Sequence, residues 1–162
     1  MYKYVSVRAK EIRKKLKDIG YNSRMVSVRS SSFSGGDDIV IRMKSVDVDE
    51  TKVREICKAY ESIDYDEYSG EILMGANSFV FVEWDWEFIT KAREKWYELA
   101  KIIYKKPCIS LDNFHWIKDS RVLSVHDKHG IRHQFMTGID GIADALLYAI
   151  EIYKVIKEDE LK

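Results

Sequence analysis

The chain has 162 residues, of which 46% are hydrophobic and 12% aromatic, so it is large and apolar enough to fold around a core, and a wholly disordered protein is excluded. Its 27 lysines and arginines balance 27 aspartates and glutamates, and this net charge of zero opposes nonspecific attraction to nucleic acid. No apolar run approaches the roughly 20 residues that span a bilayer, and the start MYKYVSVRAK lacks the apolar stretch of a signal peptide, so we expect a cytoplasmic protein.

The first predicted element is a helix over residues 6–19. Apolar residues, including Ile12 and Leu16, recur at spacings of three and four, which is the period of an amphipathic helix. Ser6 is a suitable N-cap, and Gly20 is the expected end. The side opposite the apolar line carries a basic stripe, which we expect to stay exposed: Lys10, Arg13, Lys14 and Lys17.

A β-hairpin is predicted over Ser27–Ile41. Valines and isoleucines alternate with other residues on both sides of a serine and glycine segment, which is the pattern of strands with one buried face. We assign Ser30–Asp38 to the turn, because Gly35 and Gly36 permit positive φ and the serines can bond their own backbone. This polar loop would present Arg29, Ser32 and Phe33.

A second helix and a second hairpin follow. Asp49 is a suitable N-cap for the helix, and the acidic segment Ser62–Gly70 after it has no helical period, so we place it in a loop. The hairpin would pair residues 72–74 with Ser78–Trp84 across a turn at Gly75–Asn77. Because Ser78–Trp84 is apolar on both faces, we expect a strand at the centre of its sheet.

The rest of the chain predicts a long helix and a C-terminal ββα segment. The long helix begins at Asp85 and ends before Pro107, which cannot continue it. Two strands, Arg121–His126 and Ile131–Met136, are joined by a short turn and followed by a helix that begins at Ile139.

These elements predict an α/β protein of the α+β class, with a mainly antiparallel sheet packed by helices. Their order is helix, β-hairpin, helix, β-hairpin, long helix and ββα segment. We expect residues 1–107 to form the core and residues 108–162 to form an extension packed on it as one compact unit. Cys57 and Cys108 fit reduced, structural cysteines of a cytosolic protein.

The candidate metal ligands match no motif, so we expect no metal, no cofactor and no catalytic residue. Three histidines flank or lie in the last predicted turn, where at most two side chains converge: His126, His129 and His133. The acidic loop offers carboxylates to Mg²⁺ or Ca²⁺, but their spacing differs from that of an EF-hand: Asp64, Asp66, Glu67 and Glu71.

Charge is unevenly distributed along the chain. Residues 1–44 carry +7, residues 45–100 carry −8 and residues 101–162 carry +1. Folding either mixes these charges into a neutral surface or leaves a basic and an acidic pole that attract charged partners. The cations of a candidate single-strand nucleic-acid surface are Lys10, Arg13, Lys14, Lys17 and Arg29.

Three segments of the first half carry a family resemblance: AKEIRKKLK at residues 9–17, SVRSSSFSGGDDIVI at residues 27–41 and GANSFVFV at residues 75–82. In this order they resemble the large polyvalent protein-associated domain 29 family, over residues 5–84. That family occurs in proteins of phages and conjugative elements. The resemblance therefore implies a mobile-element protein, in a setting where small proteins often neutralise host defence, and it implies no catalytic residues.

We expect an accessory protein of a phage or plasmid that binds and inhibits a host defence complex without catalysis, for example an RNA-guided nuclease, as an anti-CRISPR protein does. The partner would be a host defence protein or ribonucleoprotein. Interface energy concentrates on aromatic and arginine anchors, so the expected partner-binding residues are Arg29, Ser32, Phe33, Tyr65 and Tyr68. One alternative is an accessory protein that binds single-stranded nucleic acid through the basic helix and the hairpin. Another is a metal-dependent nuclease that uses the carboxylates or histidines.

Overall fold

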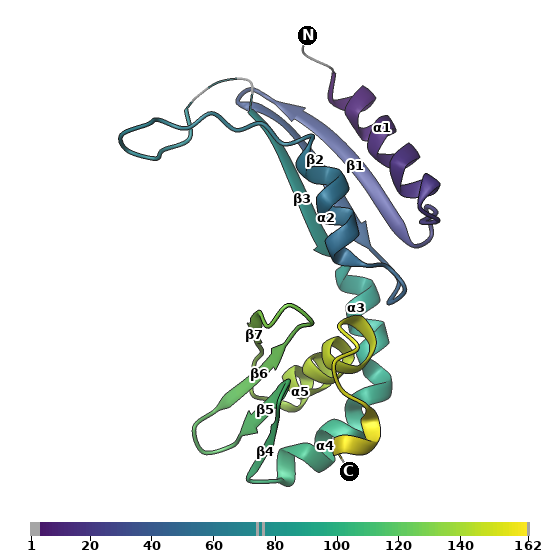
Figure 1. Ribbon diagram of the computed structural model, residues 1–162, viewed down its shortest axis with the longest axis vertical. Helices are drawn as coiled ribbons and strands as arrows, with labels where there is room; N and C mark the ends of the chain where they lie inside the picture. The colour runs from purple at the N-terminus through teal and green to yellow at the C-terminus, as the bar shows by residue number, and fades with distance from the viewer. Residues whose placement is uncertain (1–3, 74, 76, 162) are drawn as a thin grey trace. The chain divides into compact units, whose positions relative to one another are not determined.

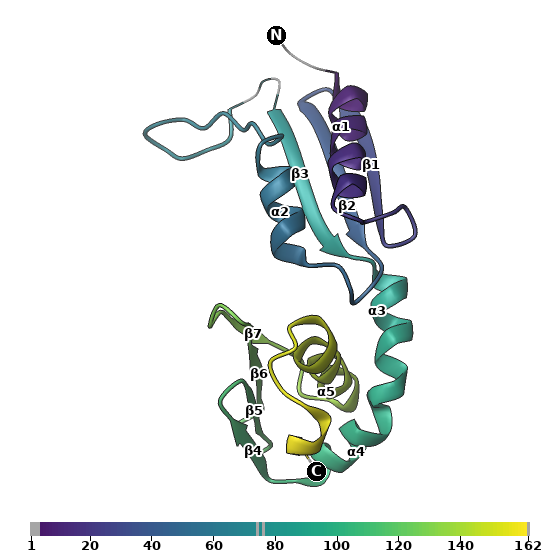
Figure 2. The same ribbon diagram turned by 45° about the vertical axis from the view of Figure 1, so that its right-hand side comes forward.

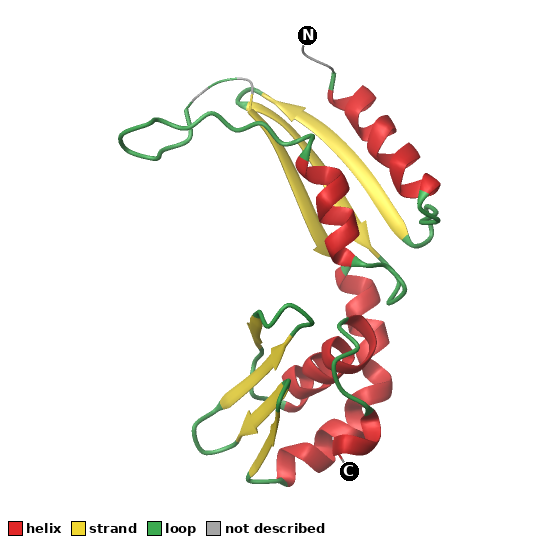
Figure 3. Ribbon diagram, viewed as in Figure 1, coloured by secondary structure: helices red, strands yellow, loops and turns green. Residues whose placement is uncertain are grey.

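The computed structural model describes residues 4–73, 75 and 77–161 (Figure 1). The chain divides into two compact units, residues 1–85 and residues 86–162. Each unit packs helices on a sheet (Figure 3), so the predicted α+β class is confirmed. The division lies after Asp85 instead of after residue 107, because the long helical segment packs against helix α5 (Ile139–Leu146) of the second unit. No helix of the described part is long and apolar enough to cross a bilayer.

The first unit is a three-stranded sheet with both helices on one face (Figures 1 and 2). Its elements are α1 (Val5–Asp18), β1 (Val26–Phe33), β2 (Gly36–Met43), α2 (Glu50–Lys58) and β3 (Asn77–Trp84). The strand order is β1-β2-β3, with β1 antiparallel to β2 and β2 parallel to β3. A parallel pair needs a crossover connection, and α2 provides it here.

Helix α1 ends as predicted but begins differently. Tyr4 occupies the N-cap position without a side-chain cap, so Ser6 lies within the first turn and is not the predicted N-cap. At the other end Gly20 has a φ of +94°, and Tyr21 donates its N–H to the carbonyl of Leu16 at 2.9 Å. This is the long hydrogen bond of a Schellman cap, which glycine permits because it adopts positive φ without strain. The end predicted at Gly20 is confirmed.

The hairpin between β1 and β2 has longer strands and a shorter turn than predicted. Pairing continues until Phe33 lies opposite Gly36, so only Ser34 and Gly35 form the turn. The predicted loop Ser30–Asp38 is therefore wrong, and most of its residues are strand residues. Serine is acceptable in a strand whose side chains reach solvent, and a two-residue turn with glycine is sufficient to reverse the chain.

Gly36 is required by the close approach of β2 and β3. Its φ is +148°, and a Cβ at this position would overlap the backbone carbonyl of Asn77. The parallel pairing of the two strands begins at this pair of residues. Any side chain at Gly36 would therefore separate the strands where their pairing begins.

The predicted second hairpin is wrong. Ile72 makes only an isolated bridge, to Tyr65, and β3 pairs in parallel with β2. Residues 74 and 76 lie outside the described part. The strand order places β3 beside β2 at one side of the sheet, so β3 is not the predicted central strand. The side chains of its second apolar face therefore point to the side of the sheet that carries no helix.

The core of the first unit lies between the sheet and the two helices. Its residues recur with period 3.6 in the helices and period 2 in the strands. They are Ala9, Ile12, Leu16, Val26, Val28, Ile39, Ile41, Met43, Val48, Val53 and Cys57. Burial of each large side chain in this set contributes about 1.5 to 3 kcal/mol.

A buried ion pair joins the helices to the sheet at the edge of this core. The side chains of Arg8 and Asp37 are only 9% and 5% exposed. Nη2 of Arg8 donates to both carboxylate oxygens of Asp37 at 2.5 Å, and Nη1 donates to the carbonyl of Tyr60 at 3.3 Å. One guanidinium therefore connects α1, the start of β2 and the segment that follows α2.

The second unit packs helices on a four-stranded antiparallel sheet of order β4-β5-β6-β7. Besides α5, its elements are α3 (Trp86–Ala92), η1 (Arg93–Trp96), α4 (Tyr97–Lys105), β4 (Cys108–Leu111), β5 (Phe114–Ile117), β6 (Val122–His126), β7 (Arg132–Gln134), η2 (Leu147–Ile152) and η3 (Glu158–Leu161). The predicted long helix and final two strands are present, whereas β4 and β5 were not predicted. Four residues are too few to show a clear alternation, which is why the sequence pattern missed both strands.

The two cysteines should differ in reactivity. Burial raises the pKa of the Cys57 thiol to about 11, and the positive charge of Arg54 offsets this only in part. Cys108 is exposed. We expect one thiol to react with a chromogenic disulfide at pH 8 in the native protein and two after denaturation, because the thiolate is the reactive form. Rapid reaction of the native Cys108→Ser variant would contradict this.

Loss of either partner of the buried ion pair should destabilise the first unit. Arg8→Met or Asp37→Leu leaves an uncompensated buried charge, which costs about 3 to 5 kcal/mol. The double variant should lose less than either single variant, because no charge then stays buried. Urea unfolding measures all three free energies. A loss below about 1 kcal/mol in both single variants would show that the pair does not stabilise the fold.

Candidate functional site

One face of the first sheet carries no helix within its unit and is partly apolar. Side chains alternate along each strand, so the residues that do not point to the core point to this face. We call it the open face, and its residues are Ser27, Arg29, Ser31 and Phe33 of β1, Asp38, Val40 and Arg42 of β2, and Phe79, Phe81 and Glu83 of β3.

Three phenylalanines form a row on the open face. The ring centroids of Phe33 and Phe79 are 6.2 Å apart with an interplanar angle of 22°, and those of Phe79 and Phe81 are 6.3 Å apart with an angle of 9°. Phe33 and Phe81 are each 50% exposed. Val40 lies opposite Phe81 in the strand register and extends the apolar area toward β1. Exposure of such an aromatic area to water is unfavourable, and its burial by a partner is favourable.

Charged residues of both signs border this row. Arg42 donates from Nε to Oε1 of Glu83 at 2.7 Å, across the β2–β3 pair. This hydrogen bond and the charge of Glu83 raise the pKa of Arg42. Asp38 accepts hydrogen bonds from the backbone N–H and the hydroxyl of Ser31. With Arg29 exposed beside them, the face carries two cations and two carboxylates.

The structure brings together two of the five expected partner-binding residues. Arg29 and Phe33 lie on the open face, four residues apart on β1. Ser32 is exposed but points to the other face, because its partner in the register is the buried Asp37. The two tyrosines lie instead on the loop between α2 and β3.

That loop is held in shape by hydrogen bonds although its side chains are exposed. The side-chain oxygen of Asn77 accepts from the N–H of Asp64 at 2.9 Å, and its amide donates to the carbonyl of Leu73 at 2.8 Å. Asp66 accepts from the N–H groups of Ser69 and Tyr68, and these bonds lower its pKa. Tyr68 is 99% exposed. The loop starts and ends at the same end of the strands as the β1–β2 turn (Figure 1).

The basic stripe of α1 is exposed as predicted but lies apart from the open face. Arg13 donates a hydrogen bond of 2.6 Å to the carbonyl of Val28. None of the four stripe residues forms an ion pair with a described carboxylate. Helix α1 lies on the covered face of the sheet, whereas Arg29 points to the open face. The five expected nucleic-acid cations are therefore not on one surface.

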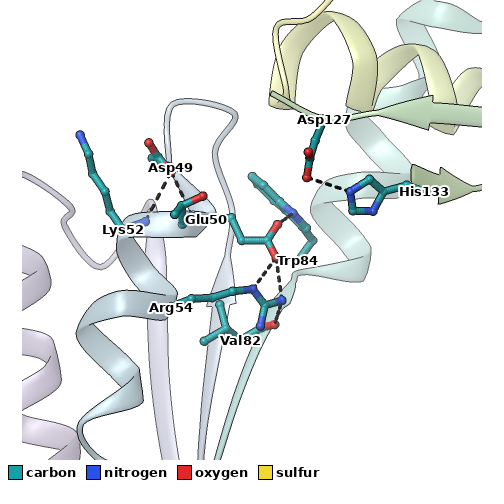
Figure 4. A network of polar contacts seen from close by, with 9 residues as sticks. Asp49, Glu50, Lys52, Arg54, Val82, Trp84, Asp127 and His133 are labelled. Atoms are coloured by element: carbon teal, nitrogen blue, oxygen red, sulfur yellow. Dashed lines mark hydrogen bonds and ion pairs between the residues drawn. The ribbon is translucent and has the colours of Figure 1, made fainter. Parts of the chain in front are cut away.

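A polar network at the other end of the sheet fixes α2 against β3 (Figure 4). Glu50 accepts a hydrogen bond from Nε1 of Trp84 at 3.0 Å and one from Nε of Arg54 at 2.8 Å. Arg54 also donates from Nη2 to the carbonyl of Val82 at 3.0 Å. Each oxygen of the Glu50 carboxylate accepts one of these bonds, and their effect is to fix α2 against β3.

The histidines of the last hairpin do not converge. His133 lies opposite Val125 in the register, and His126 lies opposite Arg132, so the two rings point to opposite faces of the sheet. His133 is held by Asp127, with 3.1 Å between Nε2 and Oδ2 (Figure 4). Within the described ranges, no group of three histidines, cysteines or carboxylates is arranged to hold a metal ion.

The strand pattern missed two of the three residues of the phenylalanine row. The alternation of Ser78–Trp84 predicts burial for Phe79 and Phe81, on the second apolar face of a central strand. The apolar character of both faces of this strand is consistent with either arrangement. Such a strand is central in a covered sheet, or it leaves one apolar face open. Only the pairing of β3 with β2 decides between these two.

Comparison with known proteins gives no assignment. No family model, no curated protein and no solved structure matches this chain.

Proposed function

We propose that this protein binds a protein partner through the open face and acts by occupying that partner, without catalysis of its own. The observation that carries the proposal is the row of Phe33, Phe79 and Phe81, whose two outer rings are half exposed and which no helix of its unit covers. Contiguous exposed aromatic area on a soluble domain is typical of an interaction site.

The composition of the open face matches that of a protein interface. Binding energy in such interfaces concentrates on aromatic and arginine residues at the centre, with polar groups around them. Here Arg29 is level with Phe81 in the strand register, with Val40 between them, and the Arg42–Glu83 pair lies two residues further along β2 and β3. Both signs of charge are available, so a partner can be recognised by complementary charges at the border.

A nucleic-acid partner fits the open face less well. Asp38 and Glu83 would repel phosphates, and Arg42 already pairs with Glu83 at 2.7 Å. The exposed lysines that would attract phosphates belong to α1, on the covered face. Residues 1–85 contain 14 lysines and arginines against 15 aspartates and glutamates, so the unit has no excess of positive charge.

The resemblance to the large polyvalent protein-associated domain 29 family supports the biological setting. We place the protein in a phage or conjugative element, and we propose that its partner belongs to a host defence complex such as an RNA-guided nuclease. A protein that inhibits its partner by covering a surface of it needs a stable binding surface and no reactive group. The open face offers such a surface.

The proposal predicts that Phe81→Ala weakens inhibition. A bacterial strain with an active RNA-guided nuclease is transformed with a targeted plasmid while this protein is expressed, and the purified nuclease complex is assayed for binding. We expect the natural chain to restore transformation and to bind the complex. Truncation of a central aromatic anchor costs about 2 kcal/mol or more, so the variant should bind roughly 30-fold more weakly or worse.

Two matched variants separate the outcomes. Ile102→Ala removes an apolar side chain of similar exposure, on α4, and should bind like the natural chain. The charge reversal of Lys10, Lys14 and Lys17 to glutamate should also bind normally. Full binding by Phe81→Ala would overturn the proposal. Salt-sensitive binding to a single-stranded oligonucleotide that is lost on charge reversal would favour the nucleic-acid alternative, and loss of inhibition with retained binding in Asp66→Asn would indicate catalysis.

A further inference from the structure

The two outer edges of the first sheet differ, and the outer edge of β3 has partners within its unit. Ser78 and Ser62 exchange two backbone hydrogen bonds, of 3.0 and 2.7 Å. Further along β3 the carbonyl of Val82 accepts the bond of 3.0 Å from Arg54. The loop after α2 and a side chain of α2 therefore hinder the addition of another strand at this edge.

The outer edge of β1 keeps backbone groups available. Lys44 donates its N–H to the carbonyl of Met25 at 2.7 Å, so Met25 and every second residue after it bond β2. The residues between them direct their N–H and C=O groups away from the sheet, and the carbonyl of Val28 accepts a bond from α1 there. Among the residues that the structure describes, none bonds the outward groups of Ser30 and Ser32. We call these four backbone groups the β1 edge.

An extended chain can approach the β1 edge from solvent. Ser32 is exposed, Ser30 is partly exposed, and the residues on either side of Ser32 are exposed as well. The strand ends at a turn of only two residues, so no long loop follows it. An added strand can therefore replace the hydrogen bonds that water makes to these groups.

On the helix side, a lysine of α1 borders the β1 edge. Arg13 reaches the outer edge of β1, and Lys10 lies one turn before it on the same side of α1. Toward its N-terminus α1 approaches the turn end of β1, because Arg8 binds Asp37, the register partner of Ser32. Lys10 therefore lies along the stretch of β1 that holds the edge groups.

On the open face, an arginine borders the same stretch. Arg29 is exposed and lies next to Ser30 on β1. Asp38 of β2 is one strand further from the edge and accepts hydrogen bonds from Ser31. In the described part of the chain, neither Arg29 nor Lys10 forms an ion pair. Both can therefore pair with carboxylates of a ligand.

We propose that the β1 edge binds an extended, acidic segment of a second protein, which adds to the sheet as a fourth strand. The backbone of the segment pairs with Ser30 and Ser32, and its carboxylates pair with Lys10 on one face and Arg29 on the other. This function goes beyond the binding of a partner by the phenylalanine row, because it uses the edge of the sheet.

A second copy of this chain fits the β1 edge less well. In an antiparallel pair of two β1 strands, the α1 helices of both copies lie on the same side of the joined sheet. Lys10 and Arg13 of one copy then approach those of the other, and these like charges repel. A nucleic acid lacks the backbone N–H and C=O groups that pair with a strand.

A capped hexapeptide of the order Val-Glu-Glu-Val-Glu-Val, which carries carboxylates on both faces when extended, tests the proposal on the full chain. We expect saturable NMR shifts of the amide signals of Ser30 and Ser32, with a Kd of roughly 1 mM or tighter, and slower hydrogen exchange of both. Ser31, whose N–H already bonds Asp38, is the internal control. The peptide with lysine in place of glutamate should not bind.

Ser32→Pro separates backbone pairing from plain charge attraction. Proline removes the outward N–H and is accepted at an edge position, so the melting temperature should change little while the peptide binds at least about tenfold more weakly. Ser32→Ala keeps the N–H and should bind like the natural chain. Lys10→Glu should weaken binding about threefold or more, and Lys58→Glu on α2 should not. Phe81→Ala should bind the peptide normally.

Three results would each overturn the proposal. The first is the absence of saturable shifts at Ser30 and Ser32, and the second is equal binding of the lysine peptide. The third is unchanged affinity of folded Ser32→Pro, which would show that charge alone attracts the peptide. Protection of Ser30 and Ser32 that rises with protein concentration without peptide would assign the edge to a second copy and would also overturn it.

Discussion

The buried ion pair between Arg8 and Asp37 is the constraint on which the first unit depends. A buried guanidinium and a buried carboxylate are each costly alone, so α1 can dock only where its arginine meets Asp37 at the start of β2. The same guanidinium bonds the carbonyl of Tyr60, which fixes where the chain leaves α2. One charged group thus sets the position of α1, the start of β2 and the start of the loop after α2. The apolar core can then pack in a single register.

The open face follows from this arrangement. With α1 and α2 both on one side of three strands, and α2 used as the crossover that places β3 parallel to β2, the other side has no remaining helix in its unit to cover it. Gly36 permits the close approach of the strands at the point where Phe33 and Phe79 stack. The phenylalanine row is therefore ordered by the same strand pairing that builds the core, which makes it a preformed surface that loses little entropy on binding.

Local patterns in the sequence predict local structure well here and long-range pairing poorly. The period of α1, its end at Gly20 and the beginning of α5 at Ile139 depend on nearby residues, and they are found as expected. The parallel pairing of β3 depends on residues far apart in the chain, so a hairpin was expected in its place. For the same reason the candidate site was predicted only in part. Phe33 follows from its hairpin, whereas Phe79 and Phe81 join it only through the register of β2 and β3.

The exposure of the phenylalanine row in the intact chain is the central claim, and paramagnetic relaxation by a neutral soluble agent tests it most directly. Ring protons of Phe33 and Phe81 should relax at rates between those of the fully exposed Tyr68 and those of the buried Phe114, which should be unaffected. If the rings of Phe33 and Phe81 are protected as Phe114 is, the row is part of a core, and it cannot be the surface that binds a partner.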